Sequence, residues 1–170
     1  RRSRHDQRLL HWRLGDPGMS SKIPATLDKL ERILSPVARV LRALEGRSLP
    51  IDEQTRLPLI ALRLRQDQPG SKSGRALTRD VVVTLPVTIE IAASSEDETH
   101  LDTDLANLLY RARAALIIAD DNGAFDKLAI SGSLQFEAAT YGYPDPGSQY
   151  ATVQQPISLL ISEHYQEDLP

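Results

Sequence analysis

The sequence contains no cysteine. This absence excludes disulfide bonds, thiolate catalysis and cysteine-ligated zinc together. Aromatic residues are also scarce, at 5% of the 170 residues, although hydrophobic residues make up 41%. The length predicts one domain, and its core must therefore be built from leucine, isoleucine, valine and alanine.

Long hydrophobic runs and a strong net charge are missing as well. No apolar run approaches the roughly 20 residues that a helix needs to span a bilayer, and residues 1–20 lack the apolar segment of a signal peptide. We therefore expect cytosolic synthesis and no membrane partner. The net charge of −3 gives no argument that the chain as a whole binds nucleic acid.

Basic residues nevertheless gather at the start of the chain. Residues 1–18 hold five arginines and two aspartates, which gives this segment a charge of +3 and leaves −6 for the rest. We divide the chain into a basic N-terminal arm, residues 1–18, and a single α+β domain, residues 19–170. Two interpretations of the arm stay open: an extension ahead of a natural start at Met19, or an arm that docks on an acidic neighbour or on DNA. In the second case, Arg1, Arg2 and Arg4 would pair with acidic residues of an adjacent protein.

The first part of the domain has apolar residues at helical spacing. They are Leu27, Leu30, Ile33, Leu34, Val37, Val40, Leu41 and Leu44. Ser35 and Pro36 interrupt the pattern, which predicts either two short helices or one kinked helix, with Gly46 just past the end. Residues 59–66 then alternate with a period of two and predict a half-buried strand, while the Gly- and Pro-containing residues 66–76 predict a loop.

Residues 76–94 form the longest strand pattern. One face of this strand carries Val81, Val83, Leu85, Val87, Ile89 and Ile91. Pro86 cannot donate a hydrogen bond to a neighbouring strand, which predicts an edge strand or a bulge. Apolar residues at helical spacing then predict a helix over residues 101–121, with Thr99 as its N-cap and Gly123 just after its end.

Two further strands are predicted near the end of the chain. The first covers residues 127–141, with a bulge at Gly132. The second covers residues 149–165, where Pro156 again indicates an edge or a bulge. Its inward face carries Val153, Ile157, Leu159 and Ile161. The predicted fold class is α+β: a mostly antiparallel four-stranded sheet with helices packed on one face.

Motifs that carry chemistry are absent from the sequence. The four histidines are His5, His11, His100 and His164, and none has the spacing of a metal-ligand motif. The stretch "DDNG" fails as a calcium-binding loop, because Ile118 and Ala129 occupy the first and last ligand positions. There is no nucleophile elbow, no dinucleotide-binding glycine motif and no phosphate-binding loop. We therefore expect no enzymatic activity, no catalytic residues, no cofactor and no metal.

A basic cluster stands out in the otherwise acidic domain. Its members are Arg63, Arg65, Lys72, Arg75 and Arg79. The cluster is either a solvated face or a contact site for another subunit or for DNA passing nearby. Strand edges marked by proline are equally consistent with contacts to neighbouring chains. We expect Arg63 and Arg65 to face away from the core, and Lys72 and Arg75 to contact a neighbouring subunit.

Six segments of the domain follow one another in a characteristic order. They are "LDKLERILSPVARVLRAL", "RLPLIALRLRQD", "RALTRDVVVTLPVTIEIAAS", "HLDTDLANLLYRARAALIIADD", "KLAISGSLQFEAAT" and "YATVQQPISLLISEHYQED". In the order of these segments and in their pattern of apolar and polar residues, residues 20–168 resemble the phage tail terminator (minor tail) proteins. The basic arm lies outside this pattern.

The resemblance implies a structural, ring-forming subunit of a virion, assembled in the host cytoplasm. Members of this family form a six-membered ring on the head-proximal end of the tail tube, which stops tube polymerisation and offers a surface to the neck or connector. The implied partners are further copies of this chain, the tube protein, the neck or connector protein and, in a contractile tail, the sheath protein. DNA would pass through the lumen without sequence recognition.

Three alternatives remain open. A head–tail joining or head-completion protein of the neck is also a small α+β ring-former, and it would bind the portal-side ring more than the tube. A small enzyme or metal-binding module would show bound metal or a deep pocket with converging polar side chains. A nucleic-acid-binding module would show an affinity for DNA that depends on salt.

Overall fold

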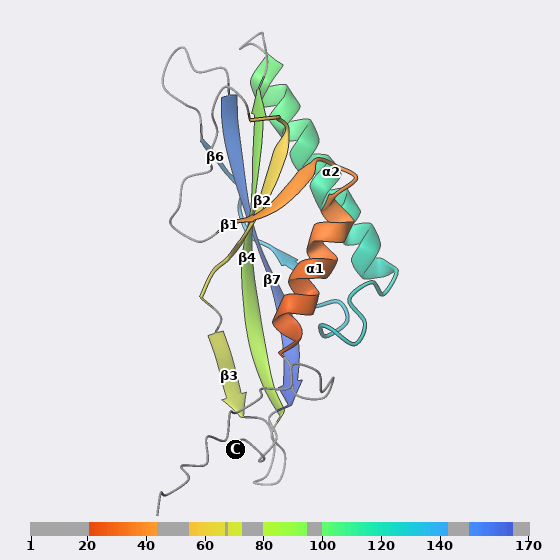
Figure 1. Ribbon diagram of the computed structural model, residues 1–170. Coiled ribbons are helices and arrows are strands. Elements are labelled where there is room, and N and C mark those ends of the chain that lie inside the picture. Colours follow the sequence, from red (N-terminus) through yellow and green to blue (C-terminus); the bar gives the residue numbers. More distant parts are fainter. Residues whose placement is uncertain are drawn as a thin grey trace, which may run out of the picture.

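The computed structural model describes residues 21–43, 55–66, 68–72, 80–94, 100–142 and 150–164, with only the backbone described for residues 68–72 and Asp80. The arm at residues 1–18 lies outside this part. The described residues form two helices and seven strands (Figure 1). In chain order they are α1 (Lys22–Leu34), β1 (Arg39–Ala43), β2 (Leu59–Leu64), β3 (Gln68–Lys72), β4 (Asp80–Ser94), α2 (Leu101–Asp121), β5 (Gln135–Phe136), β6 (Thr140–Gly142) and β7 (Tyr150–His164).

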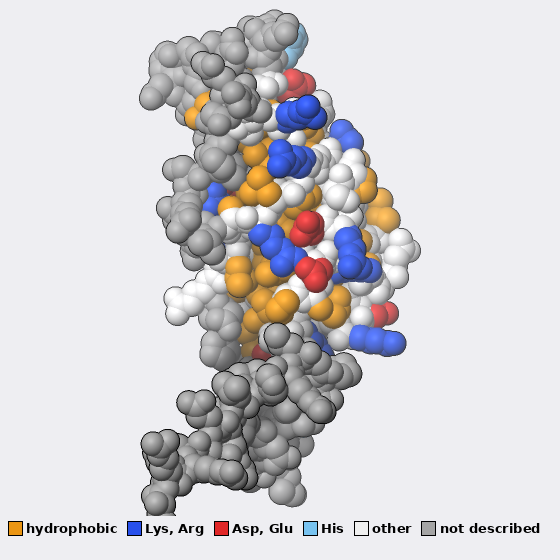
Figure 2. Space-filling model, viewed as in Figure 1, with side chains coloured by type: hydrophobic (Ala, Val, Ile, Leu, Met, Phe, Trp, Pro, Cys, Tyr) orange, Lys and Arg blue, Asp and Glu red, His pale blue; other side chains and the backbone are white. Residues whose placement is uncertain are grey.

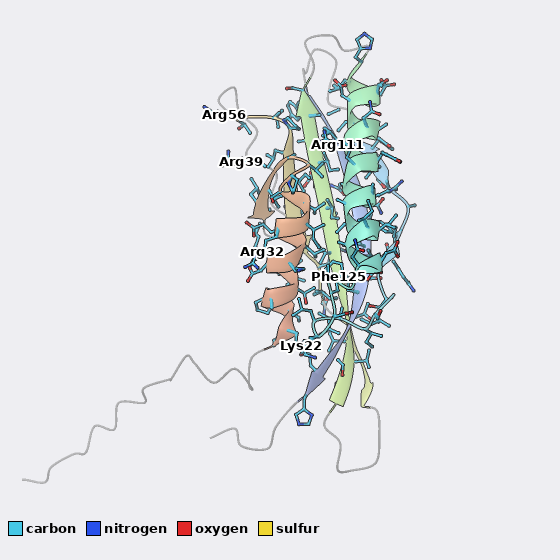
Figure 3. All side chains as sticks on the ribbon, turned by 90° about the vertical axis from the view of Figure 1, so that its right-hand side faces the viewer. Lys22, Arg32, Arg39, Arg56, Arg111 and Phe125 are labelled. Atoms are coloured by element: carbon cyan, nitrogen blue, oxygen red, sulfur yellow. The ribbon has the colours of Figure 1, made fainter. Side chains whose placement is uncertain are left out.

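All seven strands belong to one mixed sheet. The order across it is β1-β2-β4-β7-β5, with β3 also paired to β4 and β6 also paired to β7. Every pairing is antiparallel except that of β1 with β2. Both helices lie on the same side of the sheet (Figures 1 and 3). The α+β class is therefore confirmed, but the prediction of four strands is wrong, because strands of two to five residues are too short to show alternation.

The centre of the sheet is a ladder of two 15-residue strands, β4 and β7. It runs from Asp80 opposite His164 to Ser94 opposite Tyr150. At roughly 3.3 Å per residue, each strand is about 50 Å long, which makes the subunit elongated. Odd-numbered residues from 83 to 93 and from 151 to 161 are buried under the helices. This confirms the inward faces predicted for both strands.

Two prolines lie near the middle of this ladder, Pro86 in β4 and Pro156 in β7. Of the two alternatives predicted for them, an edge strand or a bulge, the edge strand is wrong, because both strands have neighbours on either side. The carbonyl of Pro86 accepts a hydrogen bond of 3.0 Å from the N–H of Arg65, between the end of β2 and the start of β3. The carbonyl of Pro156 accepts one of 3.0 Å from Glu137, between β5 and β6. The missing N–H groups are tolerated because each falls in a gap between two short strands.

The longer helix, α2, matches its prediction closely. Its buried side chains are Leu101, Leu105, Leu108, Leu109, Ala112 and Leu116. Asn122 ends the helix, and Gly123 follows with a φ of +70°, a conformation that glycine adopts without strain at this position. The predicted N-cap, Thr99, lies outside the described residues.

The shorter helix, α1, is anchored at its N-terminus by β7. Ser21 caps the helix by accepting a hydrogen bond of 3.1 Å from the N–H of Ile23. Glu163 of β7 accepts one of 3.2 Å from the N–H of Lys22 and another from the Ser21 hydroxyl. A carboxylate at this end satisfies free N–H groups and is favoured by the helix dipole.

The chain does not continue as a helix after α1. The helix ends at Leu34, Pro36 lies in the turn that follows, and β1 runs parallel to β2. The predicted second or kinked helix is therefore wrong for residues 37–43, while Leu44 and Gly46 lie outside the described residues. Val40 sits opposite Ile60 in the register and packs against the core. The apolar spacing in this segment is compatible with a helix and with a strand. Pairing with β2 stabilises the strand.

Two other predicted segments also differ. Gln68–Lys72, predicted as part of a loop, is β3, with a register shift between Pro69 and Lys72. The predicted strand over residues 127–141 consists largely of turns and holds only β5 and β6, and Gly132 lies in a turn with a φ of +69° instead of a bulge.

The part of the chain that the structure describes contains no helix that combines the length and the apolar character needed to cross a membrane.

Candidate functional site

The fold divides the basic cluster that the sequence predicted. Arg63 lies in β2 on the sheet face away from the helices, as expected, but only 8% of it is exposed. Arg65 follows β2 and is exposed. Lys72 is the last residue of β3, where the structure describes the backbone alone. Arg75, Arg79 and the arm residues Arg1, Arg2 and Arg4 lie outside the described residues.

Arg63 makes a buried ion pair with Glu90 of β4. Its Nε atom lies 2.6 Å from Oε2 of Glu90, and the two side chains are 9% and 10% exposed. Leu59, Ala61 and Ala92 are also buried on this face of the sheet. The prediction that β2 is half-buried is therefore wrong, because both of its faces are covered. Sequence reasoning missed Glu90, since alternation predicts the face of a side chain and not its burial.

A second polar group is buried on the opposite face, beneath α2. Gln155 of β7 is 1% exposed, and its Oε1 accepts hydrogen bonds from Nε (2.7 Å) and Nη2 of Arg113. Its Nε2 donates to the carbonyls of Glu137 (2.8 Å) and Pro156 (2.7 Å). The side chain therefore joins α2, β7 and the segment between β5 and β6, and it fixes the flank of α2 that faces β7.

Replacing Gln155 with leucine is expected to lower the free energy of unfolding by about 1–3 kcal/mol, because Arg113 loses its acceptor and the carbonyls of Glu137 and Pro156 each lose one donor. Urea unfolding measures the change. Gln154→Leu is the matched control, since Gln154 is the exposed neighbour on the other face and a surface change of this kind has an effect of about 0.5 kcal/mol or less. Equal losses in the two variants would contradict the role of the buried amide.

The outer face of α2 carries an apolar stripe in addition to the apolar inner face. Tyr110 is 73% exposed, Ile117 is 47% exposed and Ile118 is 59% exposed. Two further outward positions, 106 and 114, are alanines. On α1, in contrast, the outward side chains include Asp28, Lys29 and Arg32. A helix that is apolar on both faces is typical of one that is covered on both sides, so the outer face of α2 is the candidate functional surface.

Helical spacing places two of these side chains on the flank that faces β7. Tyr110 and Ile117 lie three residues before and four residues after Arg113, so the three side chains share one row of the helix. Because Arg113 bonds Gln155 of β7, this row lies on the β7 side of the outer face of α2. The signal was present in the sequence, since the apolar residues Tyr110, Ile117 and Ile118 fall outside the buried stripe of residues 101–121.

A small hollow lies on the other flank of α2. It has a volume of about 270 Å³ and is lined by Pro58, Ala93, Ser94, Asp104, Asn107, Leu108 and Arg111. This volume is below the approximately 300–1,000 Å³ of typical small-molecule pockets. Within the described ranges, no three His, Asp or Glu side chains come together as a potential metal site.

Comparisons with known proteins add little to this geometry. No protein-family model matches the chain, and no curated protein matches it either. One solved structure with 15% sequence identity covers 86% of this chain and 96% of its own, with a TM-score of 0.37. At this TM-score the likeness identifies neither a family nor a function.

Proposed function

We propose that the protein is a structural subunit of a phage virion that forms a ring, of six copies as in the family it resembles, on the head-proximal end of the tail tube. The ring ends tube polymerisation and joins the tail to the neck or connector. Its partners are further copies of itself, the tube protein, the neck or connector protein and, in a contractile tail, the sheath protein. DNA passes through the lumen without sequence recognition, and no catalytic step is involved.

The observation that carries this proposal is the exposed apolar face of α2. Aromatic and aliphatic side chains on a rigid helix are the usual anchors of protein interfaces. The elongated subunit, about 50 Å along its central strands, also offers two long sides and two ends for separate contacts. These features support assembly, and the resemblance in the order of segments indicates which assembly.

The proposed mechanism is termination by an incomplete match. One end of the ring reproduces the contact that a tube subunit makes with the subunit below it. The opposite end does not offer that contact again, so no further tube subunit adds. A closed ring requires contacts between two different patches on neighbouring copies, because such heterologous contacts close by rotation.

The test is the mass of the purified protein, alone and with assembled tail tubes, followed by electron microscopy of the tube ends. We expect a ring in solution, or a monomer that becomes a ring on tube ends, and tubes of arrested length. A protein that ignores tubes but binds the portal-side ring would favour the neck protein instead. A protein that binds neither would contradict the proposal.

A further inference from the structure

We propose that the ring contact joins the outer face of α2 in one copy to the side formed by α1 and β1 in the next. The inference rests on the proposed ring and assigns its two contacting surfaces, named here the α2 side and the α1–β1 side. The α2 side comprises Asp102, Ala106, Tyr110, Ile117, Asp120 and Asp121. The α1–β1 side comprises Lys22, Lys29, Arg32 and Arg39.

The α2 side is an apolar stripe with acidic ends. Tyr110 and Ile117 occupy its middle, and Asp102 and Asp121 lie exposed in the first and last turns of the helix. In all, α2 carries four aspartates and two arginines. One of these arginines, Arg113, is turned inward to Gln155. A partner for this side therefore needs apolar groups flanked by cations.

The α1–β1 side has that character. Between Lys22 and Ala43 there are five basic and two acidic side chains. Both acids, Asp28 and Glu31, bind the same cation, Arg42 of β1. In the described ranges, Arg32 and Arg39 have no ion pair, and both are exposed. Figure 2 views this side and shows lysine and arginine side chains spread over it, with acidic side chains near the centre and apolar side chains between them.

The two sides lie on opposite flanks of the subunit. β1 is at one end of the strand order, with α1 packed beside it, whereas α2 packs over β4 and β7, and β7 is followed by β5 at the other end. Figure 3 shows α1 with Arg32, Arg39 and Arg56 on one side and α2 on the other. Surfaces of opposite charge on opposite flanks allow head-to-tail contact, which closes into a ring when the rotation permits it.

Two double variants test this pairing. Tyr110→Lys with Ile117→Lys places cations where the partner side is already basic. Arg32→Glu with Arg39→Glu places acids opposite the acidic ends of α2. Each variant alone is expected to weaken the contact by roughly 30-fold or more, as for hot-spot residues, and to stay monomeric. Their mixture is expected to associate again, because each retains one intact side and the altered sides carry opposite charges.

Native mass spectrometry reads the outcome, with Gln154→Lys as the matched control on the exposed opposite face of β7. If rings form only on tube ends, the same variants are scored by loss of caps there. Rings or caps that persist in either double variant, or a mixture that stays monomeric, would overturn this inference while leaving the ring itself in place. A wild-type chain that neither forms rings nor caps tubes would overturn the proposed function, and circular dichroism of each variant excludes misfolding as the cause of a loss.

Discussion

Replacing Glu90 alone with leucine is expected to lower the free energy of unfolding by about 3–5 kcal/mol, the usual loss when one partner of a buried ion pair is removed. The variant leaves the guanidinium of Arg63, which is 8% exposed, without the carboxylate that lies 2.6 Å from it. A buried cation keeps its desolvation penalty while losing the attraction of this carboxylate. Urea unfolding followed by circular dichroism measures the change.

The double variant Arg63→Met with Glu90→Leu tests whether the loss of stability comes from the charge that remains in the single variant. It is expected to recover most of the lost stability, because apolar replacements of similar size remove both charges from the buried site. Glu137→Leu is the control for removing a carboxylate, since Glu137 is exposed. If Glu90→Leu costs no more stability than Glu137→Leu, the pair is not buried in the folded protein.

Replacing Phe125 with alanine is expected to cost about 3–5 kcal/mol, the usual range for deleting a buried phenylalanine. Phe125 is 1% exposed and belongs to the core beneath the helices (Figure 3). Backbone hydrogen bonds of 2.9 Å from the N–H groups of Leu128 and Ala129 to its carbonyl hold it in the turn after α2. Its ring therefore fixes the chain that leads from the helix to β5.

The chain offers a natural control, because it contains only one other phenylalanine. Phe136 packs against the same core but is only partly buried, so Phe136→Ala is expected to cost clearly less. Thermal or urea unfolding of the two variants gives the comparison. A larger loss at Phe136 than at Phe125 would show that the turn after α2 is not held by the core.

Long periodic segments made the main elements predictable. β4, β7 and α2 each repeat their apolar pattern over 15 or more residues, so the inward faces of all three followed from sequence alone. Short segments could not be predicted in this way. β1 has five residues and takes its conformation from parallel pairing with β2, a contact that no local pattern encodes.

The candidate surface was only partly predictable for the same reason. The basic cluster was grouped by its closeness in sequence, yet Arg63 lies buried against Glu90, and only the fold brings these two strands together. The exposed apolar residues Tyr110 and Ile117 were visible as departures from the polar face that a surface helix normally shows. Their direction toward β7 required the contact between Arg113 and Gln155.

The positions of Pro86 and Pro156 also have a consequence for folding kinetics. The β4–β7 ladder pairs segments that α2, β5 and β6 separate in sequence, and such non-local pairing forms slowly. Until the short strands dock, a newly formed ladder exposes two long edges that could recruit a strand from another nascent chain. Each edge carries one proline near its middle, on the side directed toward the missing strands. A proline at each position removes one N–H that an incoming strand would need, which disfavours intermolecular sheet extension.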